Sequence, residues 1–79
     1  MDDFSLRQFN ILKIIFSHSD YVTSSAIIND LGITRRTLIS DIKSINLKNE
    51  LIVSSNKGYY INQEYREEVE SILSAHKDS

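Results

Sequence analysis

Apolar residues recur at helical spacing in the first part of the chain. They form one apolar stripe that consists of Phe9, Leu12, Ile15 and Phe16. Ile11 widens this stripe. Ser5 followed three residues later by Gln8 is a capping-box pattern, in which each side chain bonds the other residue's backbone N–H. The sequence therefore predicts a helix that begins after Ser5 and ends near residues 17–20.

Two further helices are predicted, joined by a short turn. After a short extended piece at residues 21–23, Thr23 can cap a helix over residues 24–31. Gly32 supplies the left-handed backbone that commonly ends a helix, and Thr34 can cap the next one. The apolar face of that third helix consists of Leu38, Ile42 and Ile45. Its outward face is then polar and basic, with Arg36, Ser40, Lys43 and Ser44.

A hairpin is predicted next. Two strand-prone runs, residues 51–53 and 59–61, flank a polar loop at residues 54–58. Asn56 and Gly58 tolerate positive φ, which suits such a loop. A two-stranded hairpin is marginal alone, so we expect it to pack on the helices.

A last helix is predicted over about residues 64–76, capped by Asn62 and favoured by acidic residues in its first turn. Its apolar side consists of Tyr65, Val69, Ile72 and Leu73. This side must bury against the same domain, a second copy or a following domain. The order helix, short strand, helix, helix, hairpin, helix predicts an α+β fold that is mainly helical.

Composition narrows the functional classes. The chain has 79 residues, which fits a single domain over residues 1–79. So short a chain supports one small core with little room for an enclosed active site, and we expect no enzyme. The absence of Cys excludes disulfides and thiolate zinc sites and favours a reducing compartment. Because there is neither a membrane-spanning apolar run nor a signal-peptide pattern, we expect a soluble cytoplasmic protein.

The net charge of −2 is unevenly distributed. Residues 1–33 carry −2, residues 34–57 carry +3, and the remainder carries −3. A basic middle between acidic flanks is expected of a nucleic-acid binder with one binding face, although scattered basic residues also occur on surfaces that bind nothing.

Residues 23–42 place a capped helix, a glycine turn and a second capped helix at helix-turn-helix spacing. Here the sequence strongly resembles the winged helix-turn-helix modules of bacterial transcription regulators. The resemblance covers roughly residues 6–62 and rests on Val22-Thr23, Ile27, Leu31-Gly32-Ile33-Thr34, Arg36-Thr37-Leu38, Asp41-Ile42 and Gly58-Tyr59. It implies a motif at about residues 23–46 and a wing at about residues 51–62.

Within that group, the chain looks most like the N-terminal domain of sugar-responsive regulators that carry phosphotransferase regulation domains, or of virulence regulators of the Mga type. This resemblance implies a longer regulator with an effector-sensing part after Ser79. The implied partners are a double-stranded DNA operator, a second copy of the protein, and phosphotransferase-system proteins that bind through the following region. No membrane partner is implied.

The candidate DNA-binding residues lie on the third helix and the wing. Arg35 and Arg36 stand at the start of the helix, where bidentate guanidinium groups can bind guanine N7 and O6, and the sequence leaves open which of them binds bases. Thr37 and Ser40 could bind phosphate or bases, and Lys43 and Lys57 phosphate. The competing interpretation of each is an ordinary solvated side chain.

Other residues point to structure. Asp41 lies beside the apolar stripe of the third helix, so we expect it to pair with Arg7 and not to face DNA. His18 and His76 have neither Cys nor paired carboxylates near them in sequence, so we expect no metal and no other cofactor, only surface or capping roles. No nucleophile elbow or phosphate-binding glycine loop is present. Strand alternation turns only one of Tyr59 and Tyr60 outward, and the Gly58-Tyr59 match to the winged helix-turn-helix pattern implies that Tyr59 is the one in the core.

Two other functions compete with DNA binding. A winged-helix domain used for protein interaction or dimerisation would suit the net negative charge and a wing with a single lysine. An RNA-binding antiterminator domain fits less well, because the helix-turn-helix pattern is specific to readers of duplex DNA.

Overall fold

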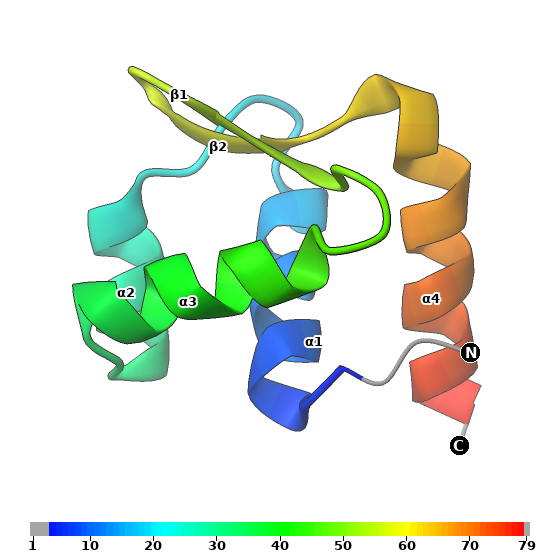
Figure 1. The fold of residues 1–79 in the computed structure, drawn as a ribbon, viewed down its shortest axis with the longest axis horizontal. Helices are drawn as coiled ribbons and strands as arrows, with labels where there is room; N and C mark the ends of the chain where they lie inside the picture. The colour runs from blue at the N-terminus through cyan, green and yellow to red at the C-terminus, as the bar shows by residue number, and fades with distance from the viewer. Residues whose placement is uncertain (1–3, 79) are drawn as a thin grey trace.

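The computed structural model describes residues 4–78, with side chains to residue 76 (Figure 1). Its elements follow the predicted order: α1 (Leu6–Ser17), α2 (Ser24–Leu31), α3 (Arg35–Ile45), β1 (Ile52–Ser55), β2 (Gly58–Ile61), a 3-10 turn η1 (Gln63–Tyr65) and α4 (Arg66–Asp78). The α+β class, mainly helical with one hairpin, is confirmed.

Three of the four predicted helix caps are confirmed as predicted, and they belong to the first three helices. Ser5 Oγ accepts from the Gln8 N–H at 3.1 Å, and Gln8 Oε1 accepts from the Ser5 N–H at 3.1 Å, so the capping box is complete. Thr23 caps α2 and Thr34 caps α3 through the same kind of bond. Gly32 has φ +65° at the end of α2, as expected of a left-handed residue there.

The hairpin differs from the prediction in the bounds of its first strand and in the role of Asn56. β1 begins at Ile52 and extends to Ser55, because polar serines continue the pairing with β2 up to a two-residue turn. Within the described residues only the two glycines have positive φ. Asn56 therefore does not adopt the positive φ that the sequence allows it. A Cβ on Gly58 would lie 2.5 Å from the Val22 carbonyl oxygen, so this position requires glycine for steric as well as conformational reasons.

A short third segment of extended chain holds the hairpin. Val22, in the link between α1 and α2, exchanges two backbone hydrogen bonds with Tyr59, at 2.9 and 2.8 Å. The extended piece predicted at residues 21–23 is therefore present, with a partner that the sequence pattern does not indicate. Tyr59 packs partly against the core while Tyr60 is exposed, so one tyrosine faces outward, as alternation predicts, and Tyr59 is the inner one, as the resemblance implies.

The start of the last helix is also corrected. Asn62 is a cap, but its Oδ1 accepts from the Glu64 N–H at 3.1 Å and begins the 3-10 turn, so the α-helix starts at Arg66 and not at residue 64. Val69 and Ile72 are buried in the core. The central part of this apolar face is therefore buried against the domain itself, and not against a second copy or a following domain.

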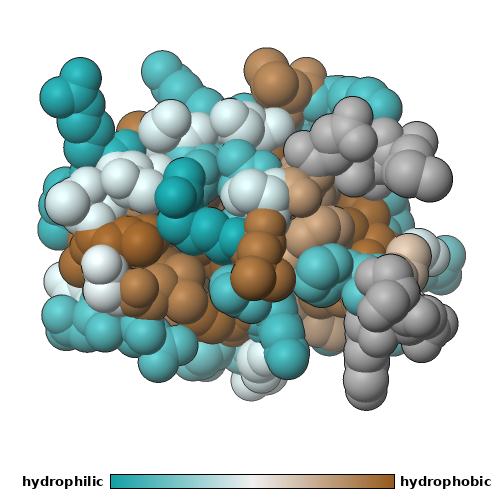
Figure 2. Space-filling view, turned by 90° about the horizontal axis from the view of Figure 1, so that it is seen from below, coloured by the Kyte–Doolittle hydropathy of each residue, from teal (hydrophilic) through white to brown (hydrophobic). Residues whose placement is uncertain are grey.

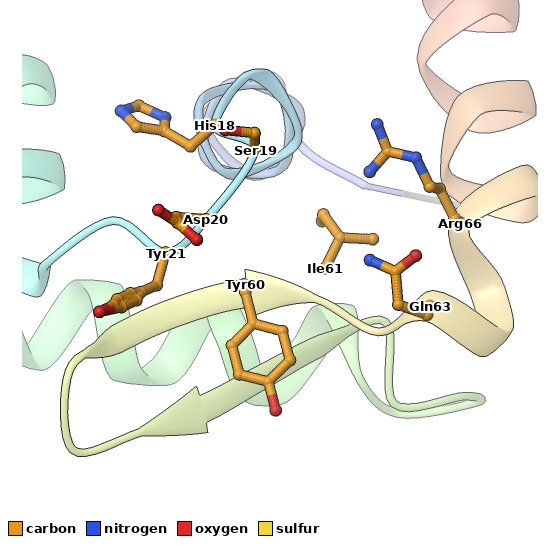
Figure 3. A pocket seen from close by; sticks show the side chains of 8 residues that line it. All are labelled: His18, Ser19, Asp20, Tyr21, Tyr60, Ile61, Gln63 and Arg66. Atoms are coloured by element: carbon orange, nitrogen blue, oxygen red, sulfur yellow. The ribbon is translucent and has the colours of Figure 1, made fainter.

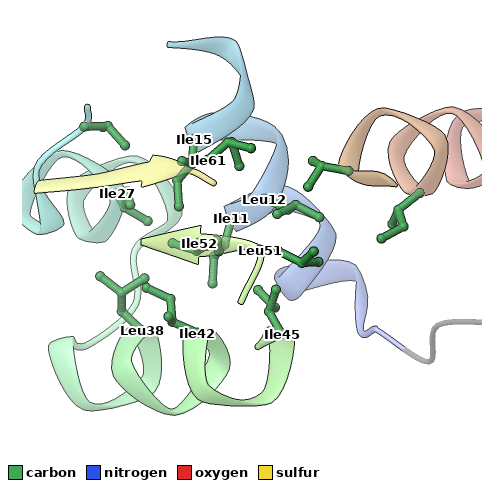
Figure 4. Packing of buried hydrophobic residues seen from close by; sticks show 13 residues of the cluster. Ile11, Leu12, Ile15, Ile27, Leu38, Ile42, Ile45, Leu51, Ile52 and Ile61 are labelled. Carbon is green, nitrogen blue, oxygen red and sulfur yellow. The ribbon is translucent and has the colours of Figure 1, made fainter. Parts of the chain in front are cut away.

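One core unites all elements (Figure 4). α1 packs against α3, α4 and β2, and α4 stands on the side of α1 away from α2 (Figure 1). The buried side chains are Ile11, Leu12, Ile15, Val22, Ile27, Leu38, Ile42, Ile45, Leu51, Ile52, Ile61, Val69 and Ile72. On the face opposite the hairpin, apolar surface is interspersed with polar side chains (Figure 2), as expected when a small domain cannot cover itself with polar groups.

Candidate nucleic-acid interface

The surface of α3 is divided into a buried and an exposed face. Leu38, Ile42 and Ile45 are buried, as their spacing predicts. The exposed side chains on the other face include Arg36, Ser40 and Lys43. Within the described residues, Arg36 makes no side-chain hydrogen bond or ion pair, so its guanidinium donors remain available to a ligand.

Asp41 fixes the orientation of α3 on α1. Its side chain is buried and accepts from Arg7 Nε at 2.5 Å, from Arg7 Nη2 at 3.1 Å and from Gln8 Nε2 at 3.2 Å. Hydrogen bonds from Arg7 hold the pKa of the Asp41 carboxyl below its ordinary value. The predicted pair with Arg7 is confirmed. The one acidic group of α3 is therefore neutralised and turned away from the exposed face.

Arg35 and Lys57 line one cleft of about 290 Å³ between the start of α2, the start of α3 and the tip of the hairpin. Arg35 Nη1 donates to Ser24 Oγ at 3.2 Å, which ties this guanidinium to the first turn of α2. Lys57 Nζ lies 5.6 Å from the centroid of the Tyr21 ring, within the range of a cation–π contact. Two cationic side chains that are distant in sequence thus line the same polar cleft.

Thr37 differs from the other candidates. Its backbone N–H donates to Thr34 Oγ1 at 3.1 Å, and its hydroxyl oxygen accepts from the Thr34 hydroxyl at 3.0 Å, so both groups are engaged within the cap. It is also only partly exposed. The predicted residues therefore fall in three places: Arg36, Ser40 and Lys43 on the outward face, Arg35 and Lys57 at the cleft, and Thr37 in the cap.

Sequence reasoning missed the groups that set the hairpin beside α3. The Asn46 side chain, at the end of α3, donates to the Ile52 carbonyl at 2.9 Å and accepts from the Ile52 N–H at 3.0 Å. It thus imitates a neighbouring strand. An asparagine after a helix indicates a cap, but no local pattern indicates which strand its amide will bind. Ile39, exposed on α3, was also missed.

The two histidines have structural contacts. His18 Nδ1 lies 2.8 Å from the Ile14 carbonyl at the end of α1, which is the expected capping role. His76 stacks on Phe9, with ring centroids 3.8 Å apart, so neither of the two roles expected for it describes this contact. In the part of the chain that the structure describes, no group of three or more His, Asp or Glu could hold a metal ion.

A second polar hollow, of about 210 Å³, lies beside β2 (Figure 3). Its charged side chains, Asp20 and Arg66, stand at opposite sides, and the Tyr60 ring points away from the others (Figure 3). The Arg66 guanidinium lies 4.5 Å from the centroid of the Phe16 ring. These groups do not converge on a common point, so the hollow offers no arrangement for catalysis.

The glycine turn between α2 and α3, the exposed basic face of α3 and the hairpin beside it together define a winged helix-turn-helix domain. The family model described as "HTH domain" matches residues 7–60, more than half of the chain. The chain belongs to this helix-turn-helix domain family. A search of curated proteins gives no match.

Membership of this family supports a DNA-binding role in transcription regulation, and domains of this kind are in general not enzymes. Within residues 4–78, no helix is both long and apolar enough to cross a membrane.

Proposed function

We propose that the chain binds double-stranded DNA sequence-specifically, as the DNA-binding domain of a bacterial transcription regulator. In this proposal α3 enters the major groove and the hairpin, as the wing, lies along the neighbouring backbone. The observation that carries the proposal is the exposed Arg36, which has no side-chain partner among the described residues, on a helix whose acidic group is neutralised by Arg7 and hydrogen-bonded by Gln8.

The geometry supports a division between the two arginines. Because Arg35 is tied to Ser24 at the cleft that also contains Lys57, we assign Arg35 and Lys57 to phosphate. Arg36 faces outward from the second position of α3, where side chains meet base edges, and we assign it to bases. Lys43, one turn beyond Ser40, is assigned to phosphate, and Ser40 and Thr37 to phosphate or bases.

A selection from a random duplex pool, followed by a salt series, tests this function. We expect one recurrent sequence to be enriched. The logarithm of affinity should fall with the logarithm of salt concentration with a slope of about −3 for each domain, since three phosphate contacts are assigned to Arg35, Lys43 and Lys57. Failure to enrich any sequence, or binding that does not respond to salt, contradicts the proposal and favours a protein-interaction domain.

We also propose that two copies bind a repeated site, because one such module buries only roughly 600–1,000 Å² on DNA and gains specificity by pairing. A groove of about 470 Å³ between α1 and α4, lined in part by Phe9, Phe16 and Leu73, suits the self-contact. Lys13 and Glu70 stand at this groove on α1 and α4. In a two-fold contact, Lys13 of each copy can therefore meet Glu70 of the other.

The resemblance to sugar-responsive regulators adds a finer proposal. We propose that the regulator controls genes of sugar uptake or metabolism and that a region after Ser79 meets phosphotransferase-system proteins. Its test is the genomic position of the selected sequence. Sites beside genes of sugar transport would support it, and sites confined to unrelated genes would contradict it.

A further inference from the structure

One large aliphatic side chain lies on the otherwise polar and basic face of α3. Ile39 is 47% exposed and does not belong to the core or to the apolar residues packed against it. Other exposed aliphatic side chains stand elsewhere: Leu6 begins α1, and Leu47 follows the end of α3. Single exposed apolar residues are common and need no explanation by themselves. The position of Ile39 is what distinguishes it.

Ile39 lies within the basic surface. It follows Arg36 by three residues and precedes Lys43 by four, and these spacings make all three side chains neighbours on the helix. It also follows Arg35 by four residues, so it shares the side of α3 that borders the cleft containing Lys57. A duplex that contacts Arg36 and Lys57 together would therefore cover Ile39.

The chemistry of the major groove limits what an isoleucine can match there. The base edges in that groove present hydrogen-bond donors and acceptors, together with one apolar group, the C5-methyl of thymine. An aliphatic side chain placed on a donor or acceptor leaves that polar group without a partner, which costs affinity. Contact with a thymine methyl group buries apolar surface on both sides.

We propose that Ile39 is a specificity-determining residue that recognises thymine through its C5-methyl group, at a base pair next to the one bound by Arg36. The proposal rests on the DNA-binding function proposed above and adds an apolar contact to the hydrogen bonds assigned to Arg36. It predicts recurrent thymine in the selected duplexes.

Uracil tests the contact, because it differs from thymine only by the missing methyl group. Duplexes enriched by the parent chain are copied with either thymine or uracil, and both copies are titrated with the parent, Ile39→Ala and Leu47→Ala. The parent should bind the uracil copy about four-fold more weakly for each methyl group that Ile39 covers. Ile39→Ala should bind both copies equally, whereas Leu47→Ala, the matched control outside the proposed interface, should retain the four-fold ratio.

The comparison between variants separates the methyl contact from any effect of uracil on DNA shape, because a shape effect would persist in Ile39→Ala. Equal binding of both copies by the parent overturns the proposal, as does an unchanged ratio in Ile39→Ala or a selection without recurrent thymine. If no duplex is enriched at all, the DNA-binding function itself fails and Ile39 loses this role with it. Enrichment of thymine-free sequences overturns only the role of Ile39. Circular dichroism of both variants should match the parent.

Discussion

At the scale of single residues, the two glycines are required for different reasons. Gly32 has φ +65°, and apart from its two chain neighbours no described residue lies within 4 Å of the place where a Cβ would stand, so the backbone conformation alone favours glycine. At Gly58 a Cβ would collide with the Val22 carbonyl, because the hairpin approaches the link between α1 and α2 closely. One glycine makes the turn between α2 and α3, and the other lets the hairpin dock.

Gly32→Val should destabilise the domain. A left-handed conformation costs a residue with a side chain about 1–2 kcal/mol, and a β-branched side chain adds to that cost. Gly32→Asn is the matched control with a smaller loss, since asparagine tolerates this conformation. Thermal unfolding measures both, and an unchanged midpoint for Gly32→Val contradicts the assigned turn.

Thr34→Ala should cost about 1 kcal/mol, because the first turn of α3 loses its cap. Amide exchange at Arg36 and Thr37 should become faster. Thr23→Ala is the control, since it uncaps α2 and should leave exchange in α3 unchanged. If exchange at those two amides is no faster in Thr34→Ala, the cap is not what orders the start of α3.

At the scale of elements, polar side chains hold α3 at two points, one within the helix and one at its end. Asp41 joins it to Arg7 and Gln8 of α1, and Asn46 joins its end to Ile52 of β1. Gln8 also completes the capping box of α1, so one side chain links the start of α1 to the middle of α3. The exposed face of α3 is thereby set relative to the hairpin.

Asp41→Asn should lower the thermal midpoint at neutral pH, and the difference from the parent should vanish in acid. The pKa of Asp41 is lowered in the folded chain, so its carboxylate contributes stability that is present above the ordinary pKa of 3.8. That contribution is lost as the pH falls through the lower folded pKa. Glu50→Gln, at an exposed carboxylate in the link between α3 and β1, is the control. A difference that persists undiminished in acid would contradict the assigned ion pair.

The sequence predicts local features of these elements well and, apart from the pair of Arg7 and Asp41, long-range partners poorly. The caps at Ser5 and Thr34 and the buried face of α3 follow from spacing within one helix. The bridge between Val22 and Tyr59 joins residues far apart along the chain, and only the packed structure decides it. Arg35 could be placed on α3 but not at Ser24, because that contact depends on how α2 and α3 cross.

At the scale of the whole molecule, a chain of net charge −2 presents a cationic surface because its charges are sorted by element. Arg35, Arg36, Lys43 and Lys57 lie on α3 and the hairpin, whereas α4 carries a cluster of acidic residues. The net charge of the chain is therefore a poor guide to its attraction for DNA, which depends on the local charge of one face.

Exchange of charges tests the proposed self-contact. Lys13→Glu should weaken association of the regulator by placing like charges together in the two-fold arrangement, and the double variant Lys13→Glu with Glu70→Lys should restore it. Analytical ultracentrifugation of the single and double variants measures the dissociation constant. Equal association by parent and Lys13→Glu would exclude this groove as the interface.

In the proposed complex, Arg36 of α3 contacts bases while Lys57 of the wing contacts phosphate. Arg36→Ala should cost about 1–3 kcal/mol on the selected duplex and less on random duplex, because a directional base contact is lost. Lys57→Ala should weaken both duplexes by the same factor and reduce the salt slope by about 1. Arg66→Ala, which removes an arginine packed on Phe16, is the matched control and should change neither.

Fluorescence anisotropy of these variants, on both duplexes at several salt concentrations, is the most direct measurement. The predicted result is a loss of discrimination in Arg36→Ala and a uniform loss of affinity in Lys57→Ala, with circular dichroism unchanged in both. Equal losses on both duplexes for both variants would mean that Arg36 contacts phosphate and that the base-reading face is wrongly assigned. If neither substitution changes binding, the claim that this surface binds DNA is wrong.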